Sequence, residues 1–254
     1  SKRAYKFEPM DTTSKVDQVI ARMRSMIIEQ SFENGRLPSE PELSRQLGIS
    51  RATVRQALSA LATEGLIVRK HGVGTFVDER VLHIPTRIEE VLDFAEMIKI
   101  SGYTPGVRHI ELRLEAGAPD VNQKLGLDPA AEIITTANVF LADGLPAIYC
   151  IDKIPAYLVN QAYRDEELHG PIYSFLQKRC DQRLDHNITQ ILPVVADSEL
   201  SRLLECPVGS PLHYFEEIGI NNLGTPIIYS EVYYRPDYFS FHVIRKMTST
   251  SQNL

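Results

Sequence analysis

The stretch SRATVRQALSALATEGLIVRKHGVGTFV, residues 50–77, decides the fold of the first third of the chain. Its first residue, Ser50, is of a type that caps helix N-termini, and a helical pattern follows to about residue 64. Gly65 then ends the helix, and LIVRK and GTFV predict two short strands joined through residues 71–74. Three apolar residues recur at the spacing of one helix face and predict its buried stripe: Val54, Leu58 and Leu61.

The residues before this stretch predict two more helices. An apolar pattern with helical spacing runs from about Ser14 to Phe32. The turn RLPSE follows, in which Ser39 is suited to cap a short second helix that has Pro41 in its first turn. Gly48 permits a tight turn before the third helix. The order helix, helix, turn, helix, hairpin predicts a winged helix-turn-helix domain over residues 14–77.

The third helix and the hairpin carry groups that bind DNA. Backbone N–H groups, hydroxyls and guanidinium groups at a helix N-terminus hold phosphates and read guanine edges in the major groove. Arg69, Lys70 and His71 would lie along the neighbouring backbone or minor groove, where Gly72 allows a close approach. The alternative is that the arginines form an ordinary solvated face; the order of the motifs favours DNA. The residues expected to contact DNA are Ser50, Arg51, Thr53, Arg55, His71 and Gly72.

Composition limits the remaining classes. The 254 residues suffice for two domains, and the net charge of −6 is divided unevenly. Residues 1–78 contain 12 Lys and Arg against 9 Asp and Glu, whereas residues 79–254 contain 15 against 24, so the first third is where a polyanion could bind. Three widely spaced cysteines fit neither a disulfide framework nor a metal knuckle and indicate a reducing compartment. With no long apolar run and no leader sequence, we expect a cytoplasmic protein without a membrane partner.

Motifs for enzyme chemistry are absent from the sequence. The histidines show no metal-ligand spacing, and no GxSxG, P-loop or GxGxxG motif occurs. We therefore predict no catalytic residue, metal or cofactor.

The rest of the chain predicts a second domain. Residues 1–13 read as a flexible arm, residues 78–86 as a polar linker and residues 248–254 as a tail. From about Ile88 to Ile98 an apolar pattern predicts a helix, and six extended runs linked by turn sequences such as ADGLP follow it. This pattern predicts an α+β domain on a mostly antiparallel sheet over residues 87–247.

Residues 35–77 resemble a known family. The pattern GRLPSExELxxxLGISRxTVRxALxxL, followed by GLIxxxxGxGTFV, is similar to the N-terminal domain of GntR-family bacterial transcription regulators. The resemblance assigns Arg51, Thr53 and Arg55 to the recognition helix, and His71 and Gly72 to the wing. Many members carry a DNA-binding arginine directly after PSE, where this chain has Pro41, so that contact is missing or supplied elsewhere.

The second region resembles the UTRA effector-binding module of the HutC subfamily, which is similar in fold to chorismate lyase. The resemblance rests on LADGLP (141–146), KIP (153–155) and TPIIYSEVYYRPDYFSF (225–241). Sugar-phosphate binders of this type often use arginines in the strand before LADG; this chain has Asn138 and Phe140 there, and Cys150 where a carboxylate is common. This departure disfavours a phosphosugar, and the carboxylates of Asp152 and Glu231 would suit an amine, guanidinium or polyol better than a phosphate. The candidate effector residues are Asn138, Phe140, Asp152, Tyr229, Glu231 and Tyr233, although the last three share one strand face and could instead pack and pair across strands.

Together these patterns predict a homodimeric DNA-binding transcription regulator, a repressor that a small-molecule effector releases from a near-palindromic operator. The alternative is a lyase-like enzyme with a DNA-binding appendage, against which stands the absence of an acid/base constellation.

Overall fold

The computed structural model of the chain describes residues 15–29, 32–78, 86–88 and 91–245. These residues form two compact units, one of residues 15–78 with Ile244 and Arg245, the other of residues 86–243. The predicted arm (1–13), nearly all of the predicted linker (78–86) and the predicted tail (248–254) lie outside the described residues.

The first unit is a winged helix-turn-helix, as the sequence predicts. Ser39 begins the second helix, because its backbone N–H and its hydroxyl both donate to the Glu42 carboxylate, at 2.8 and 2.6 Å. Gly48 ends that helix with a φ of +65°, a left-handed conformation that favours glycine. The elements are α1 (Lys15–Glu29), a 3₁₀ turn (Glu33–Gly35), α2 (Glu40–Leu47), α3 (Arg51–Thr63), β1 (Ile67–Lys70) and β2 (Gly74–Val77).

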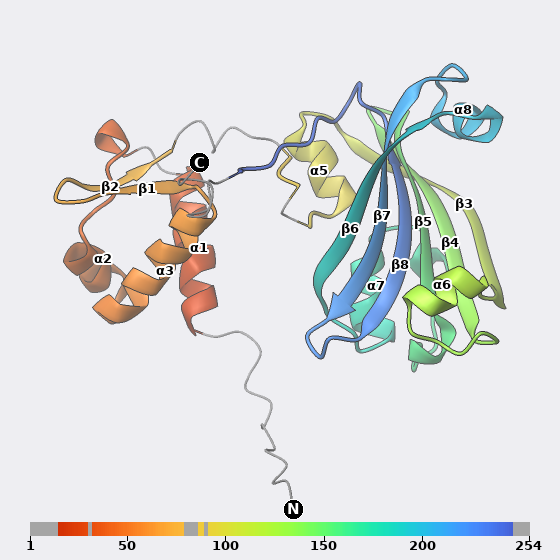
Figure 1. Cartoon of the computed structure of the whole chain (residues 1–254), viewed down its shortest axis with the longest axis horizontal. Coiled ribbons are helices and arrows are strands. Elements are labelled where there is room, and N and C mark those ends of the chain that lie inside the picture. The colour runs from red at the N-terminus through yellow and green to blue at the C-terminus, as the bar shows by residue number, and fades with distance from the viewer. Residues whose placement is uncertain (1–14, 30–31, 79–85, 89–90, 246–254) are drawn as a thin grey trace, which may run out of the picture. The chain divides into compact units, whose positions relative to one another are not determined.

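The apolar stripe of α3 forms the centre of this unit's core. Val54, Leu58 and Leu61 are buried as predicted and belong to one cluster with Met23 and Ile27 of α1. The stripe therefore fixes which side of α3 faces inward and leaves its first turn at the surface (Figure 1).

The second unit is built on one antiparallel sheet of six strands in the order β3-β4-β5-β8-β7-β6. All six predicted extended runs form strands. Their bounds are β3 (Pro105–Ala116), β4 (Glu132–Ala142), β5 (Leu145–Pro155), β6 (Leu184–Val195), β7 (Pro211–Asn221) and β8 (Pro226–Tyr234).

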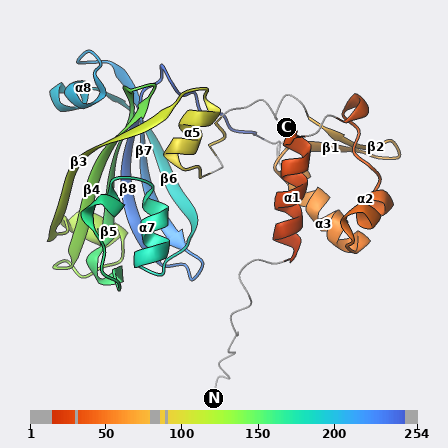
Figure 2. The same ribbon diagram turned by 180° about the vertical axis from the view of Figure 1, so that it is seen from behind.

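Helices cover both faces of this sheet (Figures 1 and 2). On one face lie α5 (Phe94–Ile100) and α7 (Ile172–Arg179), with the 3₁₀ turns Ala156–Leu158 and Asp165–Leu168. On the other face lie α6 (Pro119–Lys124) and α8 (Ser198–Leu204). Because strand residues alternate between faces, one strand contributes to two separate cores.

The helix predicted from Ile88 begins later, at Phe94. The Asp93 side chain accepts a hydrogen bond from the Ala95 backbone N–H at 2.9 Å and caps the helix there. Ile88 instead donates its backbone N–H to the His242 carbonyl at 2.8 Å, and His242 donates to the Thr86 carbonyl at 3.0 Å. Tertiary pairing between two segments far apart in sequence therefore overrides the helical pattern at Ile88.

Candidate functional site

The N-terminus of α3 presents polar groups at the surface. Ser50 caps the helix, with its hydroxyl accepting the Thr53 backbone N–H at 3.1 Å and sharing a 2.8 Å hydrogen bond with the Thr53 hydroxyl. Arg51 is exposed and makes no side-chain hydrogen bond or ion pair with any described residue. Its guanidinium group is therefore available to a ligand in front of the helix.

Glu40, the first residue of α2, holds two basic side chains. Its carboxylate accepts hydrogen bonds from the Arg55 guanidinium of α3 at 3.0 and 3.2 Å, and it also pairs with Arg69 of β1. The hydrogen bond from Arg55, together with the positive charges of Arg55 and Arg69, lowers the pKa of Glu40 below its usual value. Glu40 thus links α2 to α3 and β1 and orients the Arg55 side chain.

The wing tip is exposed, and its backbone depends on glycine. Gly72 has a φ of +71°, and nothing lies within 4 Å of where its Cβ would be. In the unbound protein, glycine is therefore favoured at this position by its positive φ and not by a lack of space for a side chain. His71 beside it is exposed, as is Pro41 in the first turn of α2.

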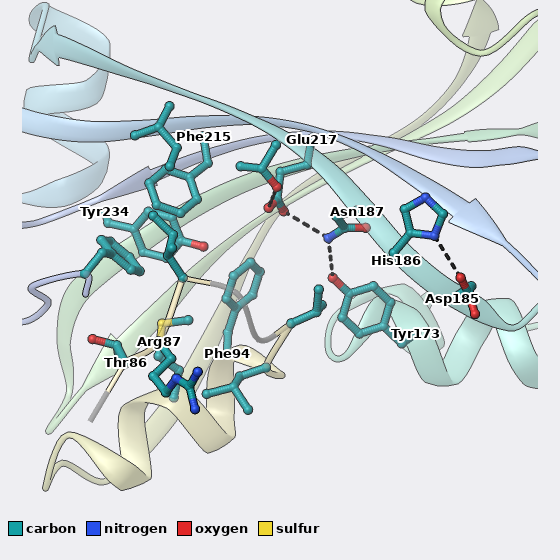
Figure 3. Close-up of a pocket in the computed structure, with 17 residues that line it drawn as sticks. Thr86, Arg87, Phe94, Tyr173, Asp185, His186, Asn187, Phe215, Glu217 and Tyr234 are labelled. Atoms are coloured by element: carbon teal, nitrogen blue, oxygen red, sulfur yellow. Dashed lines mark hydrogen bonds and ion pairs between the residues drawn. The ribbon is translucent and has the colours of Figure 1, made fainter. Parts of the chain in front are cut away.

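The second unit contains a cavity of about 600 Å³ on the sheet face that carries α5 and α7 (Figure 3). Rings from α5, the sheet and the segment after β8 line one part of it, and polar side chains of β6 and β7 line another. A second, smaller space of about 10 Å³, here called the annex, adjoins it and shares four of its residues: Leu92, Phe94, Tyr173 and Glu217. The residues that give the main cavity its character are Arg87, Phe94, Tyr173, Asn187, Phe215, Glu217, Tyr234 and Phe241.

A row of polar residues crosses the sheet at this place. Strand register puts Glu217, Ser230 and Asp152 side by side on β7, β8 and β5. The Ser230 hydroxyl donates to Asp152 at 2.6 Å, and the Thr189 hydroxyl donates to Glu217 at 2.8 Å. Burial raises the pKa of Asp152 to about 6 and also raises the pKa of Glu217.

Three of the six candidate effector residues lie on the cavity side of the sheet. Phe140 and Asp152 line the annex. Asn138 lines neither space: its amide donates to the Leu168 carbonyl at 3.1 Å and its oxygen contacts His109 Nδ1 at 3.0 Å. Asn138 therefore holds the turn that precedes α7.

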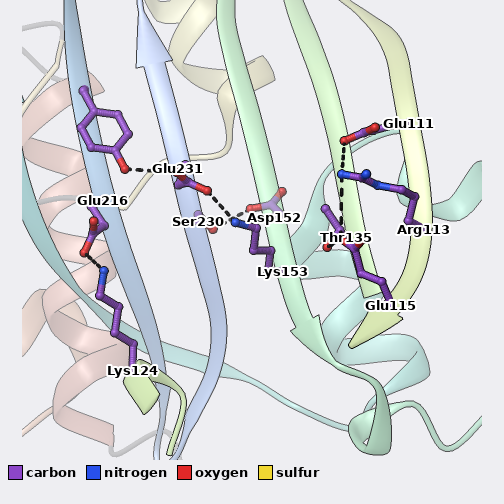
Figure 4. A network of polar contacts seen from close by, with 11 residues as sticks. Glu111, Arg113, Glu115, Lys124, Thr135, Asp152, Lys153, Glu216, Ser230 and Glu231 are labelled. Carbon is purple, nitrogen blue, oxygen red and sulfur yellow. Dashed lines mark hydrogen bonds and ion pairs between the residues drawn. The ribbon is translucent and has the colours of Figure 1, made fainter. Parts of the chain in front are cut away.

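The other three candidates, Tyr229, Glu231 and Tyr233, lie on the opposite face of the sheet and do not line the cavity. Glu231 accepts a hydrogen bond from Lys153 at 2.7 Å (Figure 4). Tyr229 packs in one cluster with Val121 of α6 and Leu125. Tyr233 contacts the ring of Tyr214, with centroids 4.9 Å apart. This arrangement matches the alternative of packing and cross-strand pairing.

Glu217 and the rings that line the cavity, Phe94, Phe215, Tyr234 and Phe241, are not among the residues that the sequence singles out. Glu217 precedes IGIN in a strand whose alternation is interrupted by several partly buried residues, so the pattern does not say which face it occupies. The face that Glu217 occupies follows from its pairing with Ser230 across the strands. In the sequence, only the turn at residues 221–226 indicates that register, because turn length sets the pairing of the strands that it joins.

Among the described residues no helix is long and apolar enough to cross a membrane, and no cluster of side chains there could hold a metal ion. The three cysteines are all buried and unpaired.

A winged helix-turn-helix joined to a separate domain that encloses a cavity defines a class of protein, the DNA-binding regulators. The chain belongs to the GntR family: the model described as "Bacterial regulatory proteins, gntR family" matches residues 15–77, and the UTRA domain model matches residues 101–240. It is therefore a DNA-binding transcription regulator rather than an enzyme.

Individual proteins similar to this chain are also transcription regulators by name. The chain is similar to the HTH-type transcriptional repressor NagR of Bacillus subtilis, with 30% identity over 81% of this chain and 83% of the relative. It is also similar to the histidine utilization repressor of Pseudomonas putida, with 28% identity over 75% of this chain and 77% of that one. In fold it resembles a solved structure titled "possible transcriptional regulator YydK" from Bacillus subtilis, with a TM-score of 0.74 at 19% identity over 92% of this chain and all of the other.

Proposed function

We propose that this regulator is a repressor that binds operator DNA through the start of α3 and the wing, and that a small molecule in the cavity releases it. The DNA contacts in this proposal are the six residues expected from the sequence. Their support is the exposure of Arg51, His71 and Gly72, and the ion pairs through which Glu40 orients Arg55. Such a regulator acts in the cytoplasm, where its operator is.

The observation that carries the effector response is the composition of the cavity wall. The wall includes residues from both ends of the second unit. Residues 86–88 and Leu92 belong to the segment that enters the unit, and Phe241 belongs to the segment that leaves it. These segments are hydrogen-bonded to each other through Ile88 and His242. A molecule in the cavity would therefore press on both connections at once.

The second of these connections continues into the DNA-binding unit. Ile244 follows Phe241 by three residues and lies against Gly65, just after the end of α3. A Cβ atom added to Gly65 would lie 2.9 Å from the Cδ1 atom of Ile244. Displacement of Phe241 would therefore move Ile244 and change its contact with Gly65 at the end of the recognition helix. For a nearly complete switch, the effector must bind the released state about 10⁴-fold more tightly than the DNA-bound state.

We further propose that the regulator is a homodimer. Two half-sites double the DNA contacts, and a two-fold axis then imposes a near-palindromic operator. Strand β6 is an edge of the sheet and exposes four large apolar side chains, which a second copy could cover: Ile188, Ile191, Leu192 and Val195.

Operator affinity of an Arg51→Ala variant tests the DNA half of the proposal. Fluorescence anisotropy with a labelled fragment from upstream of the regulator's own gene would give the affinities. Loss of a bidentate guanine contact should weaken binding by about 1–3 kcal/mol. Arg22→Ala, which removes the same charge from an exposed position on α1, is the matched control. Unchanged affinity in an Arg51→Ala protein that is folded and dimeric by light scattering would contradict the assignment.

A further inference from the structure

The annex is the most buried part of the space that the proposed effector would occupy. Its volume of about 10 Å³ is close to what one water molecule fills. Phe140, Asp152, Ser230 and Glu217 all line it, and it adjoins the main cavity at Phe94 and Tyr173. Only a group the size of a water molecule, such as an ammonium or a hydroxyl, fits there while the rest of a ligand occupies the larger cavity.

The carboxylates at the annex meet hydroxyl donors, and none of the described basic side chains pairs with them. Asp152 accepts from the hydroxyl of Ser230, and Glu217 accepts from the hydroxyl of Thr189 at 2.8 Å. Neither carboxylate forms an ion pair with any residue in the described part of the chain. Asp152 is 5% exposed, so water does little to solvate it.

The opposite face of the same sheet shows the contrast (Figure 4). There Glu216 pairs with Lys124 at 2.6 Å, and Glu231 pairs with Lys153 at 2.7 Å. The neighbouring positions Glu216 and Glu217 therefore differ: the first carboxylate meets a lysine of this chain, and the second faces the cavity.

We propose that the effector carries a primary ammonium group, which enters the annex and binds between Asp152 and Glu217. This assignment rests on the proposed function, since it names the chemistry of the molecule that the cavity takes. The ammonium donates to both carboxylates, with Ser230 holding Asp152 in place. A phosphate would be repelled by two carboxylates, and a guanidinium exceeds the space beside them.

The main cavity specifies the rest of the molecule. Phe215 contacts the rings of Tyr234 and Phe241, with centroids 4.9 and 4.6 Å away, and Phe94 completes this aromatic wall. Such a wall packs against an apolar chain, an aromatic ring or the face of a sugar. The effector class is thus a primary amine with an apolar or cyclic body.

The test is a thermal-shift titration of the full chain with matched sets of compounds. Tyramine is compared with tyrosol and 4-hydroxyphenylacetate, glucosamine with glucose and glucose 6-phosphate, and 1-aminohexane with 1-hexanol and hexanoate. Within at least one set the amine should raise the melting temperature where the alcohol and the anion do not. Glu217→Gln and Asp152→Asn should each weaken that amine about 10-fold or more, because each removes a charge-assisted hydrogen bond.

Glu231→Gln is the matched control, because it removes a carboxylate from the opposite face of the same sheet. It should leave the affinity for the amine unchanged. Both cavity variants are near-isosteric and remove a carboxylate that has no ion-pair partner among the described residues, so they should fold at least as stably as the wild type.

Three results would overturn the proposal: stabilisation by a sugar phosphate or another anion, no stabilisation by any of the amines, or an amine response that Glu217→Gln and Asp152→Asn leave intact. Anisotropy with operator DNA distinguishes this failure from failure of the proposed function. If an anion binds the cavity and releases the operator, the proposed function as an effector-released repressor is supported and the ammonium site is refuted. If the full chain binds no operator fragment, the proposed function itself fails.

Discussion

Replacing Asp152 by asparagine should stabilise the second unit, and more so at high pH. The carboxyl group is buried on the cavity face of β5, and burial raises its pKa from an ordinary value of 3.8 to about 6. The folded protein therefore binds this proton more tightly than the unfolded chain does, and ionisation opposes folding. The resulting penalty is absent below about pH 3.8, grows as the pH rises to about 6 and is constant above that.

The magnitude follows from the two pKa values. They correspond to a penalty of about 3 kcal/mol at pH 8 and about 1.5 kcal/mol at pH 5. The side-chain amide of the Asp152→Asn variant can still accept the Ser230 hydroxyl, but it does not ionise. The stability difference between the variant and the wild type should therefore grow by about 1.5 kcal/mol from pH 5 to pH 8. Removing this charge also relieves Glu217, whose pKa the Asp152 charge helps to raise, and this acts in the same direction.

Urea unfolding followed by tyrosine fluorescence measures this difference in the intact chain. The protein has no tryptophan, and ten of its eleven tyrosines lie between Tyr103 and Tyr238, so the signal reports the second unit. Titrations at pH 5, 6, 7 and 8 give the free energy of unfolding for both proteins. A difference that does not change with pH would refute the reasoning, because it would mean that Asp152 ionises equally easily in the folded and unfolded chain.

Two further substitutions test the wing and the sheet. Gly72→Val places a branched side chain at a φ of +71°, so operator affinity should fall while the thermal shift caused by a cavity ligand persists; loss of both would mean that the two units do not act separately. Gly219→Ala puts a methyl group 2.4 Å from Ile228 Cγ2, which should cost about 1–3 kcal/mol in urea unfolding. Gly170→Ala, where nothing lies within 4 Å of the added carbon, is its control, and equal stability of the two variants would show that the sheet yields at Gly219 without cost.

The DNA-binding unit was predictable from sequence because local rules and packing agree there. Ser39 and Ser50 cap the helices that they precede, and the stripe from Val54 to Leu61 is buried. The strands of the second unit were also predictable, since alternating runs separated by turn residues have few other solutions. The start of α5 was not, because the backbone of Ile88 pairs with His242, more than 150 residues away.

The sequence alone predicted the winged helix-turn-helix, because its caps and the apolar stripe of α3 depend on near neighbours in the chain. It also predicted the antiparallel strands, although the pairing of β5 with β8 joins distant segments. It also determined that Tyr229, Glu231 and Tyr233 share one face of β8, since strand side chains alternate. Which face borders the cavity was decided only by the tertiary structure. Cross-strand register brings Glu217 beside Ser230 and Asp152 on the cavity face. On the opposite face, Lys153 of β5 pairs with Glu231 and Lys124 of α6 pairs with Glu216.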